Sequence, residues 1–278
     1  MKELLLDTIF DTLKLIPYLF IAFLLLEYLE HKLSKKNEKI LIENKKYGPI
    51  FGGILGALPQ CGFSTMASSL FSNRVITIGT LIAVYLSTSD EMLPIMISQN
   101  VSIFVLLRII LFKLVVGIIV GFIIDIIIKR KKDHLEIHDR CEEDNCSCKE
   151  DGIVIASIKH TLKISLFILL ANLIIGLIIF EVGEDKLSSL LLNKNIFKYF
   201  IASLIGLIPN CASSVIITEL YLSKIITIGT LMSGLLTGSG MGILVLFRTN
   251  KNIKENLFIL GVIYFIGVIL GLIIDIFI

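Results

Sequence analysis

The sequence has no tryptophan and almost no net charge, and it lacks several familiar motifs. The formal charge of +2 over 278 residues offers no strongly basic surface for nucleic acid. It contains no G-x4-G-K-[ST] phosphate-binding run and no C-x-x-C pair of the thioredoxin type. The start, MKELLLDTIF, has no basic region followed by a cleavage site. We therefore expect a retained first helix rather than a removed signal peptide.

Apolar residues dominate what is present. They make up 55% of the chain, the mean hydropathy is +0.88, and the apolar segments recur at membrane-spanning length. The composition predicts an all-α polytopic membrane protein.

The five cysteines do not form a pattern typical of a secreted disulfide protein. Their number is odd; Cys141, Cys146 and Cys148 share one hydrophilic loop, whereas Cys61 and Cys211 lie in apolar surroundings. Thiol or metal chemistry is the better interpretation.

The sequence contains an internal repeat. A shift of 150 positions aligns Pro59 with Pro209 and Cys61 with Cys211, and it superimposes two copies of ITIGTL and the pair GFIIDI and GLIIDI, all without a gap. We expect a first transmembrane repeat at 1–130, a cytoplasmic His/Cys loop at 131–152 and a second transmembrane repeat at 153–278.

Charges in the loops predict how each repeat crosses the membrane. Each half has four apolar stretches. In the first half, basic loops lie before and after the last three stretches, and basic loops are cytoplasmic. An even number of crossings must therefore separate these two loops. One stretch must then turn back, and the stretch that contains LPQCGFS, with its proline and glycines, is the best candidate. We expect two inverted halves, each with three crossing helices and one re-entrant helical hairpin, about ten helical segments in all.

The hairpin tips predict a substrate-binding site. Irregular backbone is tolerated at membrane depth where it lines a cavity or is buried in protein, and inverted repeats bring such breaks together near the midplane. The residues that we expect there offer amide, thiol or hydroxyl groups beside the two prolines: Pro59, Gln60, Cys61 and Ser64 in the first half, and Pro209, Asn210, Cys211 and Ser214 in the second.

The third stretch of each half adds polar groups to this site. YLSTSDEMLP supplies Ser89, Asp90 and Glu91, and its mate LLTGSGMGIL retains Ser239 but no carboxylate. Charges deep in a membrane are functional candidates. We expect Cys61, Cys211, Asp90 and Glu91 to bind a transported metal, although a short outer loop around Asp90 and Glu91 is the alternative.

The central loop offers a second group of metal ligands: His134, His138, Cys141, Cys146 and Cys148. Their spacing suits a flexible chelating segment more than a fixed zinc fold. The alternative is that these loop residues are simply exposed to water and bind no metal.

Other polar residues have structural interpretations. Lys14, Glu27 and Lys113 are expected to snorkel, and Asp125 and Asp275 to cap or pair helices. The Pro-Cys segments themselves have an alternative as kinked helices with buried cysteines.

The twin motifs PQCGFS and PNCASS, each followed by TIGTL, together with the His/Cys loop, resemble the ten-transmembrane heavy-metal exporters, described as arsenic efflux proteins or manganese transporters. The resemblance implies a multi-pass permease of the cell inner membrane that exports a heavy-metal ion or metalloid by alternating access. We also expect no enzyme activity and no cofactor, and the low net charge predicts no nucleic-acid partner. A homodimer stays open, as do an intramembrane thiol-disulfide enzyme and a passive metal channel or sensor.

Overall fold

The computed structural model describes residues 9, 10, 12, 13, 16–21, 23, 24, 47–58, 61–89, 92–128, 153–182 and 196–277, without the side chains of 61, 153, 156, 172, 175–182 and 211. Every regular element in these ranges is a helix. The predicted all-α class is therefore confirmed for the described chain.

The helices of the two halves correspond almost residue for residue. The first half contains α3 (Gly48–Gly56), α4 (Cys61–Ser72), α5 (Ile78–Ser87), α6 (Met92–Ser98) and α7 (Ile103–Ile127). The second contains α9 (Ile153–Val182), α11 (Phe197–Gly206), α12 (Cys211–Leu222), α13 (Ile228–Thr237), α14 (Gly242–Thr249) and α15 (Ile253–Phe277). The shift of 150 positions superimposes α4 on α12, α5 on α13 and α7 on α15.

Four of the described stretches have the length and apolar composition to cross a membrane: 78–98, 103–127, 228–249 and 253–277. The first and third of these are divided. Where the sequence predicts one continuous crossing helix, the structure has α5 ending at Ser87 and α6 beginning at Met92, and α13 ending at Thr237 and α14 beginning at Gly242. Each half thus contains two interrupted stretches rather than one.

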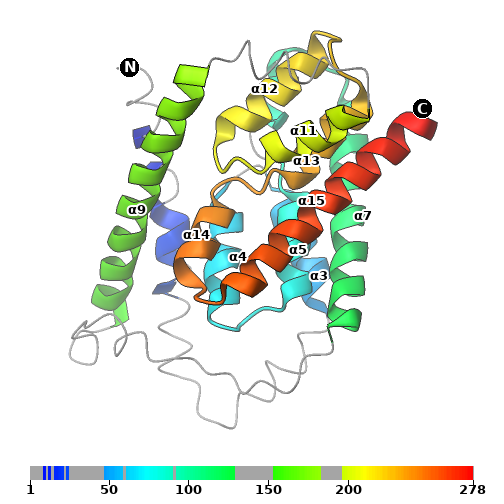
Figure 1. Ribbon diagram of the computed structural model, residues 1–278. Helices are drawn as coiled ribbons and strands as arrows, with labels where there is room; N and C mark the ends of the chain where they lie inside the picture. The colour runs from blue at the N-terminus through cyan, green and yellow to red at the C-terminus, as the bar shows by residue number, and fades with distance from the viewer. Residues whose placement is uncertain are drawn as a thin grey trace.

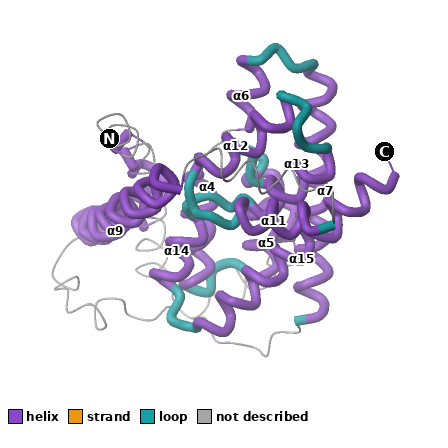
Figure 2. Tube along the Cα trace, turned by 45° about the horizontal axis from the view of Figure 1, so that its top comes forward, coloured by secondary structure: helices purple, strands orange, loops and turns teal. Residues whose placement is uncertain are grey.

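The two long helices α7 and α15 run in opposite directions. In Figure 1, α7 descends at the right, whereas α15 rises from the lower centre to the C-terminus at the upper right. The hairpin arms α3 and α4 lie in the lower half, and α11 and α12 in the upper half. Both views place α9 to one side of the bundle, where it packs against α14 (Figures 1 and 2).

The two central half-helices α5 and α13 form the core. Each is buried along nearly its whole length. α5 packs between α3 and α7, and α13 packs between α11 and α15. The outer helices α7 and α15 instead expose isoleucine, leucine and phenylalanine side chains, as helices in contact with lipid do.

The two repeats also pack against each other. The second hairpin arm of each repeat packs on the short helix of the other, α4 on α14 and α12 on α6. Since each hairpin is held partly by the opposite repeat, the two repeats form one interlocked body.

Glycines allow the core helices to approach closely. A Cβ added at Gly79 in α5 would lie 2.1 Å from the carbonyl oxygen of Gly121 in α7. The corresponding pair in the second repeat is the same, with 2.2 Å between a Cβ at Gly229 and the oxygen of Gly271. Helices in membranes associate through such small-residue contacts because lipid provides no hydrophobic drive between them.

The repeated TIGTL and IIDI motifs meet at this crossing. Thr77 caps α5 by accepting from the Thr80 amide, and it donates to Asp125 (2.6 Å). The Gly79 amide also donates to Asp125 (2.9 Å). A carboxylate near a helix N-terminus is favourable because the helix dipole is positive there.

The second repeat forms the same cap, and its aspartate accepts two further hydrogen bonds. Asp275 accepts from Thr227 and from the Gly229 amide (2.8 Å), and also from Lys198 (3.0 Å) and Tyr199 (2.8 Å). The predicted capping role of the two matched aspartates is confirmed.

Candidate functional site

The interruptions of the two repeats meet at one buried side chain, Lys113. Its ammonium donates to the carbonyl oxygen of Thr88, the C-cap residue of α5, and to that of Leu235 in the last turn of α13 (2.7 Å). One ammonium can reach both oxygens only if the C-terminal ends of α5 and α13 lie next to each other. The site is therefore built at the junction of the two central half-helices.

The electrostatics of this junction favour a positive charge. The last four carbonyls of a helix lack an N–H partner within that helix, and they form the negative end of its dipole. Two such ends converge on the Lys113 ammonium, and the residue is only 1% exposed. The junction can hold a cation away from bulk water.

The prediction that Lys113 snorkels is wrong. The residue lies near the middle of α7 on its inward face, whereas Arg108 on the same helix is exposed. A lysine at mid-membrane depth costs about 2.5 to 3.5 kcal/mol on insertion scales, and contacts inside the bundle reduce that cost. The position of Lys113 inside the apolar stretch 101–128 was the sequence feature that could have predicted its burial.

A hydrogen-bond network joins the middle of α4 to the start of α14. Ser68 Oγ lies 2.6 Å from the Tyr85 hydroxyl and from the Ser64 carbonyl oxygen, and 2.8 Å from the Gly242 carbonyl oxygen. A Cβ added at Gly242 would lie 2.9 Å from Ser64 Cβ. The predicted site residue Ser64 is thus buried against the opposite repeat, and Ser68 and Tyr85 are polar neighbours that the motif reading missed.

The predicted serines in the two breaks are buried. Ser89 donates to the Ser87 carbonyl oxygen (3.2 Å). Ser239, its mate, is 1% exposed, and its hydroxyl has no hydrogen-bond partner within the described ranges. An unsatisfied hydroxyl inside a membrane protein is costly, so it marks a place where a polar ligand could bind.

The tip of the second hairpin uses part of its predicted polarity for its own fold. Asn210 Oδ1 accepts from the Ala212 amide (2.9 Å) and caps α12, which begins at Cys211. Pro209 precedes this cap, and Ser214 lies buried in the first turn of α12. The cap occupies the amide oxygen of Asn210 that the sequence assigns to substrate.

Several predicted ligands lie outside the described residues. They are Pro59, Gln60, Asp90 and Glu91, the side chains of Cys61 and Cys211, and the loop residues His134, His138, Cys141, Cys146 and Cys148. In the part of the chain that is described, no three His, Cys, Asp or Glu side chains gather as they would around a metal ion.

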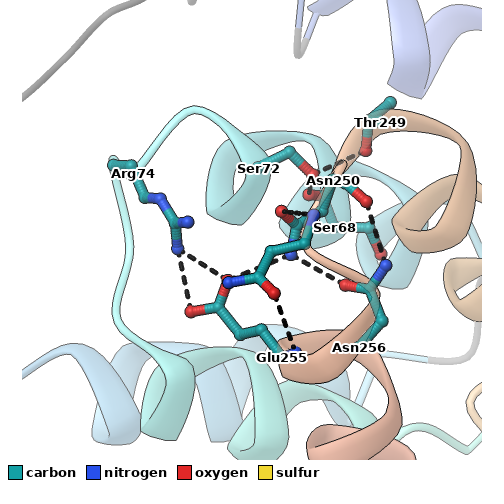
Figure 3. Close-up of polar contacts among 8 residues, drawn as sticks. Ser68, Ser72, Arg74, Thr249, Asn250, Glu255 and Asn256 are labelled. Atoms are coloured by element: carbon teal, nitrogen blue, oxygen red, sulfur yellow. Dashed lines mark hydrogen bonds and ion pairs between the residues drawn. The ribbon is translucent and has the colours of Figure 1, made fainter.

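A polar cluster lies at one end of the bundle (Figure 3). Arg74, just after α4, donates to both carboxylate oxygens of Glu255 in α15 (2.8 and 2.9 Å). Asn250 bonds Glu255 (3.1 Å) and Asn256 (2.7 Å), and nearby Ser72 pairs with Thr249 across the repeats. We call the Arg74–Glu255 pair the latch, because it ties the first hairpin to the second repeat.

The opposite end contains an open pocket of about 780 Å³. It lies between the start of α7, the end of α12 and the end of α15, and its lining includes Val105, Lys224 and Asp275. Lys224 and Val105 are the counterparts of Arg74 and Glu255 under the 150-residue shift. The site of the latch at one end thus corresponds to a pocket at the other.

Comparison with known families agrees with the resemblance of the sequence motifs. Residues 1–185 and 180–278 match the family described as "Putative, 10TM heavy-metal exporter", and together they cover the chain. The chain therefore belongs to this family, which makes it a multi-pass membrane protein of a metal-transporting class. No curated protein and no solved structure matches it.

Proposed function

We propose that this member of the heavy-metal exporter family exports a metal ion or metalloid, of the manganese or arsenic type, across the cell inner membrane by alternating access. The two repeats would form an inverted-topology pair, residues 1–130 and 153–278, on either side of a central binding site. Transport would draw on an ion gradient or on a partner subunit, since the sequence contains no nucleotide-binding loop.

One observation supports this proposal above the others: the C-terminal ends of α5 and α13 meet at a buried point. Inverted-repeat transporters bind substrate near the midplane between discontinuous helices, and the C-terminal ends of half-helices coordinate cations there. Here the two ends come from different repeats and share the Lys113 ammonium. A rigid displacement of one repeat against the other would change this site directly.

The unequal ends of the molecule support alternating access. The latch holds the first hairpin to α15 at one end, whereas the pocket opens at the other. In an alternating mechanism only one end gives access at a time. We therefore assign the described state as closed at Arg74 and open toward Lys224.

The predicted ligands fit around this junction by chain position. Cys61 and Cys211 begin α4 and α12, and Asp90 and Glu91 follow Thr88 in the sequence by two and three positions. Thiolate would favour soft metals and trivalent arsenic, and carboxylate with carbonyl oxygen would favour Mn(II). In this proposal the cysteines and the carboxylates contact the cargo, and the hydroxyls of Ser64, Ser89, Ser214 and Ser239 complete the site.

Transport in everted membrane vesicles tests the proposal. Energised vesicles that contain the intact chain should accumulate one of Mn(II), Cd(II) or arsenite above its external concentration. Cys61→Ala or Asp90→Asn should remove most of that accumulation, whereas Cys148→Ala, a matched cysteine in the central loop, should retain it. Equilibration without accumulation would identify a passive channel and contradict the proposal. Loss with Cys148→Ala alone would contradict the central site.

A further inference from the structure

Lys113 places a positive charge on the carbonyl oxygens that a transported cation would need. Its ammonium donates to Thr88 at the end of α5 and to Leu235 in the last turn of α13. Metal ions such as Mn(II) and Ca²⁺ bind carbonyl and carboxylate oxygens in the same way. The ammonium and a metal ion are therefore alternative occupants of one junction.

Packing alone does not require a lysine here. The counterpart of Lys113 on α15 is Ile263, which is fully buried. An aliphatic side chain thus suffices at the same position of the second repeat. The lysine instead introduces a charge at a depth where charges are costly, and this is typical of a residue retained for function.

The junction also has an unused polar group. The Ser239 hydroxyl is buried four residues beyond Leu235 and has no hydrogen-bond partner among the described residues. This second observation is independent of Lys113. It indicates that the present contacts do not use all the ligand atoms that the break provides.

We propose that Lys113 is a built-in cation that occupies the Thr88 and Leu235 carbonyls between transport cycles, so that its ammonium and a transported metal ion exclude one another. The inference rests on the proposed export function and deepens it by assigning a divalent cation as cargo. An arriving ion replaces the ammonium, which can swing aside on its flexible four-carbon stem. When the ammonium returns, it helps to expel the ion and keeps the empty site neutralised.

Binding of Mn(II) to the purified full-length chain tests this exclusion. Free Mn(II) is measured by electron paramagnetic resonance for wild type, Lys113→Met, Lys113→Arg and Ile263→Met. Lys113→Met should bind Mn(II) at least about tenfold more tightly, because a like charge a few ångströms away in a protein interior opposes a cation strongly. Lys113→Arg should bind no more tightly than wild type, and Ile263→Met should match it.

Unchanged or weaker Mn(II) binding by Lys113→Met would overturn the inference. Labelling of the wild-type protein covers the case in which this variant does not fold. Saturating Mn(II) should increase acetylation of Lys113, measured by mass spectrometry, and leave Lys224 in the pocket unchanged. Labelling of Lys113 that stays constant or falls would also overturn the inference.

The two proposals fail in different ways. Accumulation of arsenite by vesicles, with no Mn(II) binding by Lys113→Met, would refute the built-in cation and leave metalloid export standing. Tighter Mn(II) binding by Lys113→Met, with no accumulation of any tested ion, would support the exclusion and refute export.

Discussion

The first and second repeats are most alike where their helices cross and least alike at their breaks and ends. The crossings repeat even in detail: each central half-helix begins with a threonine cap, a close glycine and an aspartate from the long outer helix. The junction differs, because Lys113 corresponds to Ile263. The ends differ too, because the latch corresponds to a pocket lined by Lys224 and Val105.

Features shared by both repeats serve the fold, whereas features found in only one repeat are candidates for the transport mechanism. Features present in both repeats fix the half-helices, and a substitution there should damage either repeat equally. Features present in only one repeat cannot be needed for the shared fold. They are where a transporter built from two similar halves can distinguish its two sides and its bound and empty states.

The largest effect is expected at the helix crossings. Gly79→Ala and Gly229→Ala would place a Cβ 2.1 and 2.2 Å from backbone oxygens, so the helices must separate. Each should lower the free energy of unfolding by about 1 to 3 kcal/mol. Gly261→Ala is the matched control, since nothing lies within 4 Å of its Cβ.

Chemical denaturation in detergent measures this effect. Gly261→Ala should be neutral, or stabilise by up to about 1 kcal/mol through helix propensity. A large loss in one repeat with none in the other would contradict the shared scaffold.

A smaller effect should distinguish the repeats at two matched hydroxyls in the middle of α4 and α12. Ser68 links Tyr85 to Gly242 of the other repeat, whereas its mate Thr218 bonds the Ser214 carbonyl oxygen one turn back (2.7 Å). Ser68→Ala should cost about 1 to 2 kcal/mol of unfolding free energy, because it leaves buried partners without their bond. Thr218→Val should cost less than about 0.5 kcal/mol, since a hydroxyl that bonds its own helix contributes little. Equal losses measured in the same denaturation assay would show that the contact between repeats adds nothing.

The repeat and the helix boundaries were accessible from sequence because they depend on local chemistry. Prolines, glycines and apolar length mark helices and breaks, and the 150-residue shift reproduces three helix pairs without error. Residues 87–91 were predicted as polar groups deep in an apolar segment, with a short outer loop around Asp90 and Glu91 as the alternative. The helix interruption itself depends on tertiary support, since Lys113 donates to the Thr88 carbonyl oxygen at the buried end of α5.

Only part of the candidate site could be predicted from the sequence. Motif reading located the serines of both breaks, but it assigned Asn210 wholly to substrate, although its oxygen caps α12. It dismissed Lys113, because which face of an apolar helix points inward depends on packing rather than on residue type. Contacts between repeats, such as Ser68 with Gly242 and Arg74 with Glu255, join residues about 180 positions apart that no local pattern connects.

The smallest effect on stability, and the sharpest test of the two ends, concerns the latch. Glu255→Gln should cost under about 1 kcal/mol of unfolding free energy, because partly exposed ion pairs contribute little. It should nevertheless make the closed end easier to open. A cysteine reagent applied from that side should then label Ser72→Cys faster in the Glu255→Gln background than in the parent.

The converse substitution adds a latch where there is none. Val105→Glu places a carboxylate in the pocket that Lys224 also lines, and it should slow transport by closing the open end. Val105→Gln, of nearly equal size but uncharged, should not. If Glu and Gln at position 105 slow transport equally, bulk rather than charge is responsible. The unequal ends would then reflect pocket shape and not a missing ion pair.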